Sequence, residues 1–266
     1  MTTSSPGATT TRLSPERYLE LLQADAGRLV EAARLGPLTL DVPPCPGWTV
    51  HDAVHHTAVV YHHKVACMRL QRRPEEGEWP QPPLEEGGDL LPWFEASLRM
   101  LVDELEQRGP DAPSYTWLPE DQTVGFWYRR MAQETAVHRV DVESAHDCMT
   151  PVADDLAVDG VDEVLALMLT DDWSDLPAEE WGDVSPQAGA GGVIAVRTGD
   201  SGWRVTLNPD RIDVVREPGA ASAQVTGEPS EVLLWLWGRR PDSAVRLSGD
   251  PALLTAFRDR LRLANQ

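Results

Sequence analysis

The chain has 266 residues, of which 41% are hydrophobic and 25% charged, the balance of a soluble protein with one large or two modest domains. Its 43 acidic and 23 basic side chains give a net charge of −20, and such a field repels nucleic acids and anionic membrane surfaces. We therefore expect neither as a partner, and no run of about 18 apolar residues predicts a transmembrane helix.

Residues 1–13 are rich in serine, threonine and glycine and contain no apolar segment. They are expected to form a disordered tail rather than a signal peptide, which favours a cytoplasmic location. Ser14 is a suitable N-cap and Pro15 a suitable first helical residue. A helix is therefore predicted from this point to about Leu35, where a Gly-Pro pair ends it.

After a proline-rich loop, Thr49 and Asp52 have the spacing of a capping box, which predicts the start of a second helix. Apolar residues recur at helical spacing in that segment. Three later segments are also predicted to be helical. The predicted helices span 49–73, 90–107, 122–145 and 156–169. Together with the first helix they predict a helical bundle over residues 14–171.

The amino-acid composition changes after the predicted bundle. Residues 172–192 are acidic and rich in Gly, Ala and Pro, which indicates a linker. Short β-branched runs separated by turn residues then alternate with two helical segments, so residues 193–266 are predicted to form a smaller α+β domain. The expected strands are 193–198, 203–207, 211–215 and 223–226, and the expected helices are 229–237 and 251–263.

Glu134 and His138 are the strongest candidates for chemistry. Four residues apart on a helix, a carboxylate and an imidazole lie on one face, one turn from each other. A third nitrogen would complete a two-histidine, one-carboxylate metal site, which keeps a coordination position open. The alternative is a solvated side-chain pair, but the apolar residues around this pair favour a buried position, where a charge needs a partner.

The third ligand is left open by spacing alone. The second predicted helix contains five histidines, and the helical wheel places them in two groups rather than selecting one. These histidines are His51, His55, His56, His62 and His63. The three cysteines are widely spaced and lack a CxxC pair, so a disulfide framework or a cysteine zinc site is not expected.

Two motifs resemble the mycothiol-dependent maleylpyruvate isomerase family. Residues 46–56 (PGWTVHDAVHH) are similar to its PGWTVxDxxxH helix start, and residues 133–141 (QETAVHRVD) are similar to its second signature, HETAVHRWDAE. The resemblance covers nearly the whole chain. It implies a DinB-like metal-binding bundle followed by a small sterol-carrier-like α+β domain.

The resemblance also implies a ligand set and a cosubstrate. The family's first metal ligand is the histidine eight residues after the tryptophan, here His56, and its other ligands match Glu134 and His138. Two imidazoles and one carboxylate suit Zn²⁺, which stabilises a bound thiolate. The implied thiol is mycothiol, acting as cosubstrate with a small electrophilic molecule.

Four further residues are candidates for catalytic roles. Asp141, three residues after His138, could orient that ligand, or form a surface ion pair. Arg139, like Arg130, could bind substrate carboxylates, although a structural salt bridge is slightly favoured for Arg139. The family uses an arginine of its C-terminal domain, for which Arg239 and Arg246 are equal candidates.

The leading hypothesis is a zinc enzyme in which the metal-held thiolate adds to an electrophile, as in the cis–trans isomerisation of maleylpyruvate to fumarylpyruvate. The first alternative is a mycothiol S-transferase acting on another electrophile. The second is a non-catalytic protein whose α+β domain binds an apolar ligand. A hydrolytic zinc enzyme is disfavoured because no HExxH-type base is present. Oligomeric state is not predicted.

Overall fold

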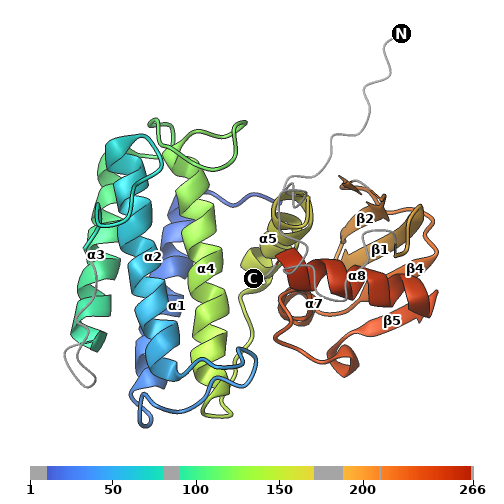
Figure 1. Cartoon of the computed structure of the whole chain (residues 1–266), viewed down its shortest axis with the longest axis horizontal. Coiled ribbons are helices and arrows are strands. Elements are labelled where there is room, and N and C mark those ends of the chain that lie inside the picture. The colour runs from blue at the N-terminus through green and yellow to red at the C-terminus, as the bar shows by residue number, and fades with distance from the viewer. Residues whose placement is uncertain (1–10, 81–89, 171–187, 210, 265–266) are drawn as a thin grey trace. The chain divides into compact units, whose positions relative to one another are not determined.

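The computed structural model describes residues 11–80, 90–170, 188–209 and 211–264. The chain divides into two compact units, one spanning Leu13–Thr150 and the other containing Pro151–Gln266 (Figure 1). Most of the predicted tail and linker lies outside the described residues. Within those residues, no helix combines the length and apolarity needed to cross a membrane.

The first unit consists of four helices that lie alongside one another (Figure 1). Ser14 caps the first through a hydrogen bond from the backbone N–H of Arg17, and Thr49 and Asp52 form the predicted capping box of the second. Both caps satisfy backbone donors that a helix start leaves unpaired. The helices are α1 (Pro15–Ala33), α2 (Val50–Leu70), α3 (Leu90–Arg108) and α4 (Val124–Ser144).

Helix α4 is the central element of this unit. It packs against α1 and α2 and also contacts α3. Every residue of α4 is buried except Gly125 and Glu134. A helix enclosed to this extent holds its polar side chains in fixed surroundings, since each must find a partner inside the protein.

The fifth helix belongs to the second unit, so the division falls earlier than the sequence suggested. We expected the bundle to continue to residue 171, whereas α5 (Asp154–Glu163) and the π-helical turn η1 (Val164–Met168) lie in the second unit. Buried Asp162 of α5 accepts hydrogen bonds from Trp203 Nε1 at 3.0 Å and Arg216 Nη2 at 2.9 Å. Helix α5 is therefore tied to the α+β unit.

The second unit contains a five-stranded sheet with the order β3-β2-β1-β4-β5. Strands β1 and β4 are parallel, and the other neighbours are antiparallel. Strand β5 and the short 3₁₀ turn before it were not predicted from the sequence. The elements are β1 (Gly192–Thr198), β2 (Ser201–Leu207), β3 (Ile212–Val215), β4 (Ala223–Thr226), α7 (Pro229–Leu236), η2 (Asp242–Ala244), β5 (Arg246–Gly249) and α8 (Pro251–Ala264). The predicted fold class, a helical bundle followed by a smaller α+β unit, is confirmed.

Candidate metal centre

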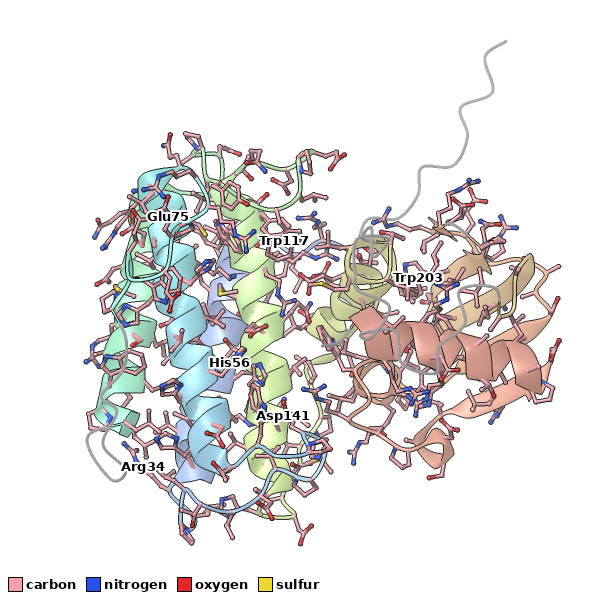
Figure 2. All side chains as sticks on the ribbon, in the orientation of Figure 1. Arg34, His56, Glu75, Trp117, Asp141 and Trp203 are labelled. Carbon is pink, nitrogen blue, oxygen red and sulfur yellow. The ribbon has the colours of Figure 1, made fainter. Side chains whose placement is uncertain are left out.

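Three side chains from two helices converge in the first unit. His56 projects from α2, and Glu134 and His138 project from α4 one turn apart. The Nε2 atoms of His56 and His138 lie 3.3 and 3.2 Å from the same oxygen of Glu134, Oε1. The potential ligand atoms of all three lie within 4.8 Å of one another. Figure 2 shows His56 on α2 beside α4.

Asp141 contacts the imidazole of His138 on the side away from Glu134. Its Oδ2 lies 3.0 Å from Nδ1 of His138, and the Asp141 side chain is fully buried. This contact occupies Nδ1 and leaves Nε2 directed at the other two side chains, an arrangement usual for metal-binding histidines. Burial lowers the pKa of His138, but Glu134 and Asp141 outweigh this effect and raise it to about 9.

Arg130 fixes the carboxylate in a comparable way. Its Nη2 donates to Oε2 of Glu134 at 2.7 Å, so that Oε1 is the oxygen left for both histidines. Burial raises the pKa of Glu134, yet His138, His56 and Arg130 lower it well below its usual value. Glu134 is therefore an ionised carboxylate held at both oxygens.

A cavity of about 460 Å³ adjoins this cluster. His56, Trp48 and Val59 are among its lining residues, with Gly47, Asp52 and His55. The indole of Trp48 stacks on His138 with centroids 5.9 Å apart and tilts against His56 at 5.0 Å. Sequence reasoning gave Trp48 no role of its own. Its position after Pro-Gly, just before the helix cap, places its indole against His56 and His138.

The remaining histidines of α2 have other partners. His51 and His55 stack on each other, and His62 contacts Ser97 Oγ at 2.9 Å while stacking on Trp93. Only His56, among the five, joins Glu134 and His138 in a cluster of the described residues that could hold a metal ion. The geometry thus agrees with the ligand that the family resemblance implied.

Arg139 lies in a separate, closed network. Its side chain is fully buried, and it donates to Asp25 Oδ1 at 3.1 Å, Glu143 Oε2 at 2.8 Å and the carbonyl of Thr150 at 2.6 Å. These contacts tie α4 to α1 and to the segment after α4. They support the structural salt bridge rather than a role in binding substrate.

The two C-terminal candidates belong to the second unit. Arg239 donates from Nη1 to the carbonyl of Trp237 at 2.8 Å and lies over the indole of that residue. Arg246 is exposed at the start of β5. A catalytic role for either arginine stays a prediction.

A bundle that presents a His/Glu/His cluster beside a cavity, followed by a small α+β unit, defines a class of two-unit proteins. Residues 11–143 match the mycothiol maleylpyruvate isomerase N-terminal domain, and residues 155–256 match the C-terminal domain of the same family. The chain therefore belongs to the mycothiol-dependent maleylpyruvate isomerase family, as the two motifs indicated.

Solved structures agree with this assignment. The crystal structure of the mycothiol-dependent maleylpyruvate isomerase is 15% identical, with a TM-score of 0.57, over 91% of this chain and 97% of that one. A histidine-to-alanine mutant of that isomerase is 14% identical, with a TM-score of 0.56 and the same coverage. At this identity the matches show a shared fold. No curated protein matches the sequence. The prediction of an enzyme is confirmed at the level of the family.

Proposed function

We propose that the chain is a zinc-dependent enzyme that uses mycothiol to convert maleylpyruvate into fumarylpyruvate, acting in the cytoplasm. The observation that carries this proposal is the convergence of His56, Glu134 and His138 beside a cavity, in a chain of this family. A histidine–carboxylate set of three leaves a coordination position for a further ligand.

The residues present fit a zinc ion. Two imidazole Nε2 atoms and one carboxylate oxygen lie within 4.8 Å of one another, and Asp141 and Arg130 hold the far sides of His138 and Glu134. Such supporting contacts are usual behind zinc ligands. When bound, zinc would lower the pKa of a thiol and favour the thiolate at neutral pH.

The isomerisation then needs one addition and one elimination. The thiolate sulfur adds to an alkene carbon conjugated with a carbonyl, which converts the double bond into a rotatable single bond and places the electron pair on the carbonyl oxygen. After rotation, the pair returns, the C–S bond breaks, and the trans alkene and the thiolate are released. Trp48 walls the cavity beside the ligands, where it would exclude water and limit the positions open to the substrate.

A mycothiol S-transferase is the second candidate. The same ligands and cavity would activate the thiol, and the adduct would leave as a stable thioether instead of eliminating sulfur. The observation that favours it is the same His/Glu/His cluster beside a cavity, which bears on binding of the thiol and not on the later fate of the adduct.

Metal analysis of matched variants tests the ligand set. His56→Ala is expected to abolish zinc binding, while His55→Ala, which removes the neighbouring imidazole from the same cavity, should retain about one zinc per chain. Inductively coupled plasma mass spectrometry of both purified proteins measures this. Equal zinc in the two variants would refute the proposed ligands.

A thiol-dependence assay tests the reaction. Chromatography is used to monitor the loss of the cis substrate, which should require added mycothiol. The mycothiol should be recovered unchanged at the end of the reaction. Consumption of one thiol per turnover would identify the transferase instead. Turnover at the same rate without thiol would exclude both.

A further inference from the structure

A second cavity lies next to the candidate metal centre. It measures about 600 Å³ and is lined by Val59, His63, Arg73, Pro74, Glu76, Gly77 and Trp79. Val59 also lines the cavity beside His56, so the two spaces share a wall on α2. A ligand held in the second cavity would thus lie close to a group positioned at the metal.

Two donors of this second cavity have no acceptor. The indole Nε1 of Trp79 is buried and has no hydrogen-bond partner. Among the described residues, the guanidinium of Arg73 makes neither a hydrogen bond nor an ion pair. Its neighbour Arg72, in contrast, is held by both oxygens of Glu78. A buried donor is normally satisfied, so the unused indole N–H of Trp79 indicates a missing acceptor. Arg73 is exposed, and its guanidinium is available to the same acceptor.

His63 supplies a third donor because of the residue beside it. Lys64 is the only lysine of the chain, and its Nζ lies 3.1 Å from Nδ1 of His63. An ammonium group can only donate, so Nδ1 accepts and the ring proton stays on Nε2. Burial, followed by the charges of Lys64 and Arg73, lowers the pKa of His63 to about 4, which keeps this imidazole neutral near pH 7.

Lys64 itself is a cation without a matching carboxylate. Its Nζ lies over the indoles of Trp117 and Trp127, at 5.8 and 5.3 Å from the ring centroids (Trp117 is labelled in Figure 2). Within the described part of the chain, no acidic side chain lies at ion-pair distance from it. Lys64 and Arg73 therefore leave local positive charge in a protein whose net charge is −20.

We propose that this cavity is a carboxylate-binding subsite, in which Arg73, Trp79 and His63 donate to an acidic group and Lys64 fixes the imidazole of His63. Glu76 also lines the cavity, and its negative charge offsets part of the positive charge of Arg73 and Lys64. The assignment of this group as the acidic end of the electrophilic substrate rests on the proposed function. The anion site itself does not.

Binding of maleate to the metal-free full chain tests the subsite without any zinc or thiol. Isothermal titration calorimetry should detect maleate and not its uncharged diamide. Arg73→Gln and Trp79→Phe should each weaken maleate binding, about tenfold for the arginine, because charge-assisted hydrogen bonds are strong. Arg99→Gln removes the same charge from an exposed position on α3 and should leave the affinity unchanged.

Three results would overturn the subsite. Equal affinity in Arg73→Gln and Arg99→Gln would show that the cavity is not the binding place. Inorganic phosphate binding as tightly as maleate would remove the preference for carboxylates. Binding that is lost in His138→Ala but retained in Arg73→Gln would place the anion at the candidate metal centre instead.

The single lysine allows a second measurement that does not depend on new variants. Reductive methylation with ¹³C-formaldehyde labels only Lys64 and the N-terminal amine, which gives two distinguishable NMR signals. Maleate should shift the Lys64 signal and leave the amine signal in place, whereas the diamide should shift neither. An unmoved Lys64 signal at saturating maleate would contradict the proposal. If zinc or thiol dependence fails while this shift is seen, only the proposed function is refuted.

Discussion

Helix α4 carries two buried polar clusters that differ in one respect. Around Arg139, each acidic group has a basic partner and the cluster ends in a backbone carbonyl. Around Glu134, two imidazole nitrogens and a carboxylate oxygen converge beside a cavity. The charges of the Arg139 cluster are paired within the protein, whereas the potential ligand atoms of the Glu134 cluster lie beside a cavity.

The contrast teaches how a structural ion pair can be told from a functional one when both are buried. Charge and depth are similar, and both clusters use residues four apart on α4. What separates them is that only the Glu134 cluster combines two imidazoles with a carboxylate beside a cavity, whereas the Arg139 cluster is an enclosed ion-pair network. Substitutions on α4 should therefore separate stability from metal binding.

The largest expected effect is on metal affinity. Glu134→Gln should reduce zinc binding below detection by calorimetry, because a neutral amide replaces the carboxylate of the proposed ligand set. The matched change on the other cluster, Glu143→Gln, should leave the zinc stoichiometry unchanged. If both variants bind zinc alike, the distinction between the two clusters is wrong.

Removal of Arg139 should have the largest effect on stability. Arg139→Met removes the buried cation between Asp25 and Glu143 and leaves only the partly exposed Arg28 near them, which costs about 3–5 kcal/mol of unfolding free energy. Urea denaturation monitored by circular dichroism measures this. The folded fraction should still bind zinc. If the variant loses both stability and zinc binding, the two clusters are not independent.

Asp141→Asn should have an intermediate effect. The amide can still contact Nδ1 of His138 but removes the charge behind it, so zinc affinity is expected to fall about 10–100-fold with the fold intact. A competition titration against a chelator gives the affinity. An unchanged affinity would mean that Asp141 contributes only to packing.

The smallest effect is expected at the edge of the Arg139 cluster. Arg28 is 39% exposed and lies 3.4 Å from Oε1 of Glu143. Because exposed ion pairs contribute little, Arg28→Gln should change the unfolding free energy by less than about 1 kcal/mol. A loss of unfolding free energy comparable with that of Arg139→Met would show that Arg139 is not the only arginine that stabilises the buried carboxylates.

Local chemistry in the sequence was enough to predict the helix starts and half of the candidate site. Ser14 and Thr49 act on backbone groups within three residues, and the spacing of Glu134 and His138 needs only the helical period. The third ligand could not be derived in this way. Periodicity groups the α2 histidines by face but does not reveal which face meets α4, and the family motif supplied that information.

Long-range partners explain the errors in the fold. The apolar stripe of α5 predicted a helix but not that its partners, Trp203 and Arg216, follow some 40 residues or more later. Strand β5 was missed because it is short and largely exposed, so no alternation marks it. The placement of Arg139 depended in the same way on Asp25 of α1.

The almost complete enclosure of α4 has a consequence for how this protein could evolve. A helix in which only Gly125 and Glu134 escape burial tolerates few changes, so the ligand-bearing side of the site is expected to vary slowly. In the segment after α2, Arg73 and Glu76 line the neighbouring cavity but are exposed, so these two positions are less constrained by packing. New substrate preferences would most readily arise by exchanging residues there, while the inherited chemistry stays in place.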